Sequence, residues 1–531
     1  MGLSLFNRRI CNTYSGVIKT CDNTPITVTP KPMTDGVGND VPIDIGTSTI
    51  CYGGTQDFSG ATVIGISGAT AGLVSGAGTN SMVSSGSLGV LATADGTCSI
   101  SIGSGAYNDQ ERSISIGQGA TGLCTCTIAI GFASNGNGVS ALALGNSSTV
   151  SANCGIAIGT FAQAGGLHGI GIGSSSNARC LNSISIGQIS DVLSDSATAV
   201  GNATCIGPSA VSSTVLGTSA SVFSNYSLAV GNSSCVGTNA DYSVSIGRMT
   251  RVCSTTLTGG ACCSIAIGPD AQITDGGGPD GSYHSIAIGR IAASCCRWGI
   301  AIGNESVAGE DSAISVGLQT EARGKWSIAL GKTACVDTGA DCSTVIGANS
   351  CIGPSTSKGI VIGTSNTLTS GNSAVVLGEL NNVSTGNQIV IGQRNCSTLN
   401  GFGILMGYSS CALSGSNNIV LGYANCAVAQ NGISIGRNQN ISNLSYDAIN
   451  IGSYSIVNCM CGIALGRNTQ VNHTRGYVIG YNVSSTRSDV LTTCELETCV
   501  AGCGLIVKTP DGLNSYRIAV DNSGNITTAL A

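Results

Sequence analysis

The sequence is poor in charged and aromatic residues. Of its 531 residues, 9% are charged and 4% are aromatic, whereas 42% are hydrophobic. A low charge content argues against a solvated, disordered chain. A shortage of aromatic residues argues against an ordinary globular core, which they usually fill. The net charge of −6 comes without a basic tract, so we expect no binding to nucleic acid.

Long hydrophobic runs are also missing. No segment approaches the roughly 20 apolar residues of a membrane-spanning helix, and residues 1–9 lack the apolar stretch of a secretory signal. Phe6 stands where a myristoylation motif has Ser or Thr. We therefore expect no membrane insertion.

Histidine is rare too, and no pattern typical of catalysis accompanies it. The only three, His168, His284 and His473, share no local motif with an acid and a nucleophile. Cys494, Cys499 and Cys503, which lie outside the repeats, lack a close histidine and the spacing of a zinc site. We expect no metal, no cofactor and no enzymatic activity.

One acidic cluster leaves an alternative open. A pair of carboxylates could hydrolyse glycosidic bonds, although isolated charges on exposed turns explain such residues more simply. A groove in which carboxylates of neighbouring repeats meet would favour the enzyme. The cluster and its basic neighbours are Glu305, Glu310, Asp311, Glu321, Arg323 and Lys325.

What the sequence does contain is one repeated unit. An aliphatic–small–aliphatic triplet closed by glycine occurs 26 times, first at Ser99–Gly103 and last at residues 477–480. Most copies are 14 to 16 residues apart, which leaves room for two strands and two turns per copy. The sequence predicts an all-β fold, a rod-shaped β-solenoid with one copy per turn.

The motif glycine is invariant because the turn needs either a positive φ or a close backbone approach. Its spacing is strictly 14 residues in the first part of the array and stretches to 21 residues twice, around a loop-like segment at 274–281. The structural glycines of the strictly spaced part are Gly103, Gly117, Gly131, Gly145, Gly159, Gly173, Gly187 and Gly201.

Alternation along the strand separates the motif into two faces. The residue before the glycine is aliphatic in all 26 copies, and two positions earlier it is Ile, Leu or Val in 22 of them. We expect this pair to fill the core. The small residue between them is then expected to face outward and to contact another chain, with Ala129, Ala157 and Ala301 as candidate interchain contacts.

The middle residue becomes Val or Leu from Val345 to Val420. Two interpretations are open. Either the outer face is more apolar there and forms a tighter or wider subunit contact, or β-propensity alone selects valine.

The motif resembles a known family. Ser264–Gly268 and Ser285–Gly289 both read Ser-Ile-Ala-Ile-Gly, like the head repeat of YadA-like trimeric adhesins. The resemblance implies a left-handed parallel β-roll and a homotrimer. Near the C-terminus, Asp511–Gly512 and Ser523–Asn525 are turn sequences of a short hairpin. That region resembles the terminal piece of phage and viral fibre proteins.

These features predict three regions and a function. We expect residues 1–86 to attach the protein to a particle or cap the first turns, residues 87–481 to form the β-roll, and residues 482–531 to form a capping or distal hairpin. The first hypothesis is a homotrimeric fibre or spike on a virion surface that binds a host glycan or protein. The alternatives are an extracellular, cell-surface adhesin head and a glycan-depolymerising enzyme.

Half of the 26 cysteines recur at two fixed positions in the repeat. Seven lie four residues after the motif glycine, so Cys396, Cys411 and Cys426 should stack as a ladder, either as small packing residues or as staples between turns or chains. The adjacent pairs Cys262–Cys263 and Cys295–Cys296 are the better candidates for interchain disulfides.

Overall fold

The computed structural model describes residues 92–493 apart from 254–259, 275–280, 400 and 414, residues 505–530 apart from 522, and short segments between residues 19 and 82. It divides into two units, residues 1–72 and 73–531. All regular structure in the described residues is β-strand. Most of the predicted attachment segment, residues 1–86, lies outside the described residues.

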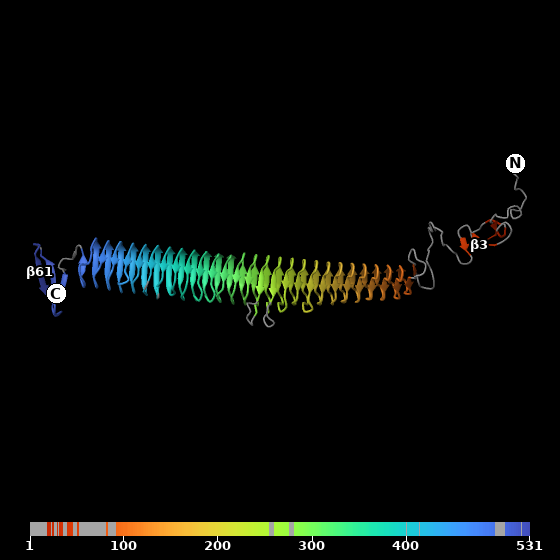
Figure 1. The fold of residues 1–531 in the computed structure, drawn as a ribbon, viewed down its shortest axis with the longest axis horizontal. Helices are drawn as coiled ribbons and strands as arrows, with labels where there is room; N and C mark the ends of the chain where they lie inside the picture. The colour runs from red at the N-terminus through yellow and green to blue at the C-terminus, as the bar shows by residue number, and fades with distance from the viewer. Residues whose placement is uncertain are drawn as a thin grey trace, which may run out of the picture. The chain divides into compact units, whose positions relative to one another are not determined.

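The second unit contains a parallel β-solenoid, visible in Figure 1 as a long rod of stacked turns. Each full turn gives one strand to each of two sheets. Every strand pairs in parallel with the strand one turn away, as β11 (Ile128–Ile130) does with β13 (Leu142–Leu144). At roughly 4.8 Å per turn, about 28 turns give a rod on the order of 130 Å long. The predicted β-solenoid is confirmed.

Strand length changes along the solenoid. In the first sheet, strands have three residues from β7 (Ile100–Ile102) to β33 (Ile300–Ile302). They have five or six from β35 (Ile314–Leu318) to β57 (Tyr477–Tyr481), and β58 (Leu491–Thr493) closes the sheet. The second sheet runs from β6 (Thr93–Ala94) to β56 (Gln470–Val471) in strands of two or three residues.

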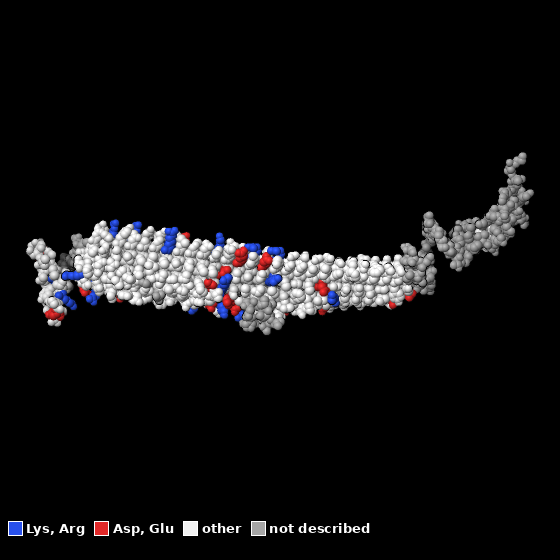
Figure 2. All heavy atoms as spheres, viewed as in Figure 1, with Lys and Arg blue, Asp and Glu red and all other residues white. Residues whose placement is uncertain are grey.

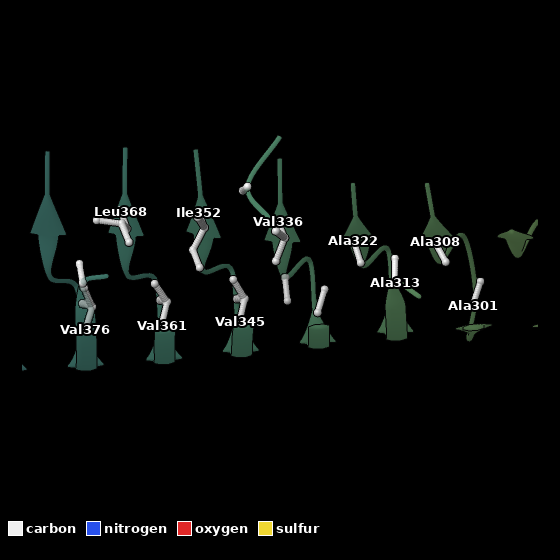
Figure 3. Close-up of a cluster of buried hydrophobic side chains, with 14 of the residues drawn as sticks. Ala301, Ala308, Ala313, Ala322, Val336, Val345, Ile352, Val361, Leu368 and Val376 are labelled. Atoms are coloured by element: carbon white, nitrogen blue, oxygen red, sulfur yellow. The ribbon is translucent and has the colours of Figure 1, made fainter. Parts of the chain in front are cut away.

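The core is the narrow space between the two sheets. In the turn of Gly145, the inward residues are Ala141, Ala143, Ser148 and Val150, and none is more than 2% exposed. Figure 3 shows the same arrangement later in the rod, where side chains from the two sheets point toward one another. Because the space is so thin, small residues fill it.

The predicted orientation of the first strand is therefore wrong. Ala129, Ala157 and Ala301 are completely buried inside their own chain, so they cannot contact another chain. The aliphatic residues on either side of them face outward and are partly exposed, as Ile128 and Ile130 are. Alternation correctly separates the two faces, but the sheets lie too close together for the larger side chains to be the inner ones.

The valine-rich stretch belongs to the core as well. Val345, Val361 and Val376 are fully buried and face Ile352 and Leu368 of the second sheet. The interpretation as a more apolar outer face with a tighter or wider subunit contact is therefore wrong, whereas selection of valine by β-propensity stays a prediction. In this stretch the inner residues of the first sheet are larger than alanine, and the strands of that sheet are longer.

The structure gives two reasons for the motif glycine. From Gly103 to Gly201, φ lies between +125° and +140°, a region closed to other residues. A Cβ placed on Gly131 would also lie 2.1 Å from the carbonyl oxygen of Gly145 in the next turn. The backbones of successive glycines are in direct contact, and no side chain fits between them.

Two other positions in each turn adopt the left-handed conformation without needing glycine. They lie five residues before and two residues after the motif glycine, as Ser140 (φ 57°) and Ser147 (φ 52°) do around Gly145. Here φ is near the value that ordinary residues tolerate at a modest cost. Glycine occupies the second of these positions only at Gly105 and Gly119, so the repeat pattern did not reveal the left-handed conformation.

Buried asparagines form a hydrogen-bonded column in the C-terminal half. The side-chain amide of Asn381 donates to the carbonyl of Gly392 (2.8 Å) and to Oδ1 of Asn366 (3.0 Å). Its own Oδ1 accepts the backbone N–H of Asn395 (3.0 Å). Each amide thus ties its turn to the turns before and after it.

Two antiparallel sheets complete the described structure. At the N-terminus the order is β1 (Lys19–Thr20), β2 (Lys31–Thr34), β3 (Asp40–Ile45) and β4 (Ile50–Tyr52). At the C-terminus it is β59 (Leu505–Lys508), β60 (Ser515–Val520) and β61 (Ile526–Leu530). Gly512 (φ 72°) and Gly524 (φ 83°) occupy the two C-terminal turns, where the sequence predicts them.

We expect Gly131→Ala to destabilise the solenoid by at least about 3 kcal/mol, because the new Cβ meets the backbone of the next turn. Gly119→Ala is the matched control. Its φ is +66° and its Cβ would have nothing closer than 3.9 Å, so the cost is about 1 kcal/mol. Hydrogen exchange around residues 117–145 measures both, and equal protection in the two variants would contradict the explanation.

We expect Asn381→Leu to cost about 3 kcal/mol or more, because it leaves the Asn395 N–H buried without a partner. Asn381→Ser should cost less than about 1 kcal/mol. Ser410 holds the equivalent position two turns later, where its hydroxyl donates to Gly422 and accepts from the Asn425 N–H. Thermal unfolding ranks the variants, with exposed Asn382→Ser as the neutral control; a serine variant as unstable as the leucine variant would contradict the role of the column.

Candidate functional surfaces

The outward face of the first sheet is apolar along the whole rod. Its residues lie one and three positions before each motif glycine, and none of them is charged in any of the 26 copies. Many are well exposed, including Ile360 (40%), Ile362 (39%) and Ile389 (42%). The largest apolar patch on a monomeric protein covers about 300–600 Å², and a two-column face of this length exceeds it. We call it the apolar face.

The outward face of the second sheet is mixed and carries the predicted cysteine ladder. Cys396 pairs in register with Cys411, and Cys411 with Cys426; Cys335 pairs with Cys351 in the same way. These thiols are half-buried. The interpretation as core-packing residues is therefore wrong, because their side chains lie on the outside of the sheet.

Neighbouring thiols in the ladder differ in acidity. A hydrogen bond from Cys426 stabilises the thiolate of Cys411 and lowers the pKa of Cys411 to about 6. The same hydrogen bond and burial raise the pKa of Cys426. Burial raises the pKa of Cys396. Cys411 is therefore the reactive thiol of this column.

The four candidate disulfide residues are thiols in the single chain. Cys263 is exposed at a left-handed turn position (φ 55°), and Cys262 is half-buried beside it. Cys296 donates to the carbonyl of Gly309 (3.3 Å), and burial followed by the charge of Glu310 raises the pKa of Cys296 to about 12. Cys295 is also half-buried. Their pairing between chains stays a prediction, and Cys263 is the most accessible.

The acidic cluster is split between two places. Glu305 and Glu321 line one groove of about 560 Å³ together with Ile291, Gln319 and Cys335. This is the convergence of carboxylates that would favour an enzyme. However, Glu305 is paired with Arg290, and Glu321 with Arg323 (3.1 Å). Each carboxylate in this groove therefore already has an arginine partner.

The other acidic residues lie elsewhere. Asp311 forms an ion pair with Arg297 at 2.7 Å and caps its backbone N–H, and this hydrogen bonding lowers the pKa of Asp311. Figure 2 shows that acidic and basic side chains intermingle in the middle of the rod. This region is a set of ion pairs between turns.

The histidines are not brought together. His168 contacts Asn182 one turn on, His284 is exposed on a turn, and His473 contacts Ser485. Among the residues that the structure describes, no three His, Cys, Asp or Glu side chains are grouped to hold a metal ion. No helix in the same residues is long and apolar enough to cross a membrane.

Exposed aromatic residues occupy the same turn position in several turns, which the sequence did not lead us to expect. They lie five residues before the motif glycine, where other turns have Ser or Cys. Trp298 and Trp326 are 52% and 60% exposed, and Tyr226 and Tyr242 stack at 5.0 Å. The signal was present, because a chain with so few aromatics places them at a turn position instead of in the core.

Comparison with models of known protein families finds no match to this chain, and comparison with curated proteins finds no similar sequence. The similarity to YadA-like head repeats thus stays at the level of the motif.

We expect Cys411 to be alkylated at neutral pH, because a pKa of about 6 leaves it mostly thiolate above that pH. Cys426→Ala removes the hydrogen-bond donor and should move the midpoint of the pH–rate profile about two units higher. Peptide mass spectrometry after iodoacetamide labelling measures the profile. Cys396→Ala is the control, and an unchanged midpoint in Cys426→Ala would rule out this explanation of Cys411.

Proposed function

We propose that this protein is the structural fibre or spike of a virus or phage particle. In this proposal the solenoid is a left-handed β-roll that assembles as a homotrimer on the virion surface. The N-terminal segment joins the particle, and the rod displays a surface that attaches to a host glycan or protein. The apolar face is the observation that carries the proposal.

The apolar face requires a partner of matching length and spacing. Its aliphatic columns repeat once per turn and carry no charge. Burying apolar surface contributes about 25 cal/mol per Å², so leaving such a face in water for some 26 turns is costly. Another copy of the same chain offers the same repeat over the same length. Self-association around an axis along the rod therefore fits this surface best.

The C-terminal sheet supports the same arrangement. Its three strands bury almost nothing within one chain; Ile526 is 74% exposed and Val520 67% exposed. A three-stranded sheet without a covered apolar face is marginally stable in water. Packing of such sheets from several copies would supply the missing core, as in a terminal piece that closes a fibre.

A rod with repeated surface columns suits attachment more than catalysis. Each copy in an oligomer presents the same columns, so weak contacts add through avidity. The paired carboxylates Glu305 and Glu321 do not favour the enzymatic alternative, because each is held by an arginine.

The absolute mass of the full-length chain in solution, with and without reductant, tests the proposal. We expect about three times 52.6 kDa in both conditions, because burial of the apolar face, not disulfides, holds the copies together. A monomer in both conditions would overturn it. A trimer that dissociates only under reductant would instead assign the assembly to cysteines such as Cys263.

A charge placed on the apolar face sharpens this test. Replacing Ile288, Ile302 and Val316 with Lys puts three cations on adjacent turns of the face and should weaken assembly by repulsion and desolvation. The control variant replaces Gln188, Asn202 and Thr218 with Lys instead. These residues directly follow the motif glycines of three successive turns, and their replacement should leave the mass unchanged. Equal masses for the two triple variants would show that the apolar face is not the contact between copies of the chain.

A further inference from the structure

A column of tyrosines and arginines runs along one edge of the rod near its C-terminal end. Its members lie one or two positions after the motif glycine of their turn. Equivalent positions in successive turns therefore stack on one another. Tyr408 pairs in register with Tyr423, Tyr423 with Arg437, and Arg467 with Tyr481. We call this column the Tyr–Arg ladder; its residues are Tyr408, Tyr423, Arg437, Tyr454, Arg467 and Tyr481.

The ladder residues contact one another through their aromatic faces. Tyr408 and Tyr423 stack with ring centroids 5.3 Å apart. The guanidinium of Arg437 lies over both Tyr423 (5.5 Å) and Tyr454 (5.7 Å), and that of Arg467 lies over Tyr481 (5.5 Å). The tyrosines nevertheless remain accessible, with Tyr454 44% and Tyr481 56% exposed. These contacts hold large side chains in place at the surface.

A cavity of about 300 Å³ opens on this ladder. It is lined by Tyr454, Arg467, Asn468, Tyr481 and Asn482. The amide of Asn468 donates to Oδ1 of Asn482 at 2.6 Å. Two aromatic rings, one guanidinium and two amides thus meet in a space that suits one or two sugar rings.

The arginines of the ladder differ from those in the middle of the rod. Arg290 follows its motif glycine directly and pairs with Glu305, which lies one turn on and two residues after the next glycine. Arg248 pairs with Asp270 in the same register at 3.0 Å. At the position that would neutralise Arg467, the chain has Asn482.

Arg437 follows the same rule. Its equivalent neighbour one turn on is Tyr454 and not an acid. Among the described residues, neither Arg437 nor Arg467 is in an ion pair. In Figure 2, basic side chains stand alone along the upper edge of the rod toward its C-terminal end. The ladder is therefore positively charged in a chain whose net charge is −6.

We propose that this cavity binds an acidic sugar, one that carries a carboxylate or a sulfate, within a host-surface glycan. Arg467 offers two parallel N–H donors to the anionic group. Tyr454 and Tyr481 pack against the apolar face of the sugar ring, and Asn468 and Asn482 hydrogen-bond its hydroxyls. The assignment deepens the proposed attachment function and rests on it for the choice of a host glycan.

Calorimetric titration of the full-length protein tests the assignment with four probes. They are 3′-sialyllactose for the carboxylate, a heparin-derived hexasaccharide for the sulfate, lactose as the neutral sugar, and polyglutamate as an acid without sugar. We expect one or both acidic sugars to bind, with an affinity that falls as salt rises. No binding by either, equal binding of lactose, or equal binding of polyglutamate would each overturn the proposal.

Asn482→Asp is the decisive variant, because it restores the neutralising carboxylate found beside Arg248 and Arg290. The register already accommodates such a pair, so the fold should persist. We expect at least about tenfold weaker binding. Arg475→Gln is the matched control: Arg475 is an exposed arginine already paired with Asp489, and its loss should leave binding unchanged. Unchanged binding in Asn482→Asp would overturn the role of Arg467.

The mass measured on the same samples separates this proposal from the proposed function. Acidic-sugar binding by a monomer would retain the site and reject the trimeric fibre. A trimer that binds none of the probes would retain the trimeric fibre and reject the sugar site. If Tyr481→Ala lowers the mass, the ladder is a contact between copies, which would also overturn the assignment to a glycan.

Discussion

Direct contact between the backbones of successive motif glycines is the constraint on which the rest of the solenoid depends. A Cβ on Gly317 would lie 1.7 Å from the carbonyl oxygen of Gly331, so neighbouring turns can approach only where both lack a side chain. This contact fixes the register between turns. Once the register is fixed, every residue at a given offset from the glycine lies directly above its equivalent in the next turn, and insertions must leave the rod between the strands.

The thin interior follows from the same close stacking and determines the character of the surface. Only Ser, Ala, Gly, Val and a few larger residues fit between the sheets, so the aliphatic residues of the motif are left outside. In the C-terminal half the core also holds Leu368 and the hydrogen-bonded Asn381 column. A protein built this way leaves its larger aliphatic side chains on the surface, where they form an apolar face.

Stacking also places equivalent residues of successive turns in contact, so that the acidity and the ion pairing of each residue depend on its neighbour in the next turn. A thiol next to a thiol, as at Cys411 and Cys426, changes the acidity of both. Arg290, one turn from Glu305, forms an ion pair, whereas Arg467 has Asn482 at the equivalent position and forms no ion pair among the described residues. The chemistry of the surface is therefore set by the pair of residues that one repeat length brings together, which is why a substitution at one turn acts through the next.

The sequence by itself determined the period, the parallel stacking, the glycine turns, the cysteine ladder and the hairpin turns at Gly512 and Gly524, because each depends on local spacing or on backbone freedom. It did not determine which face of the first strand is inside. Alternation places Ala129 on the opposite face from Ile128 and Ile130 but does not say which face is inside. The usual preference of aliphatic residues for the core predicted the wrong face. Only the tertiary structure decided this, because the distance between the two sheets, and not the hydrophobicity of the side chain, limits what can be buried.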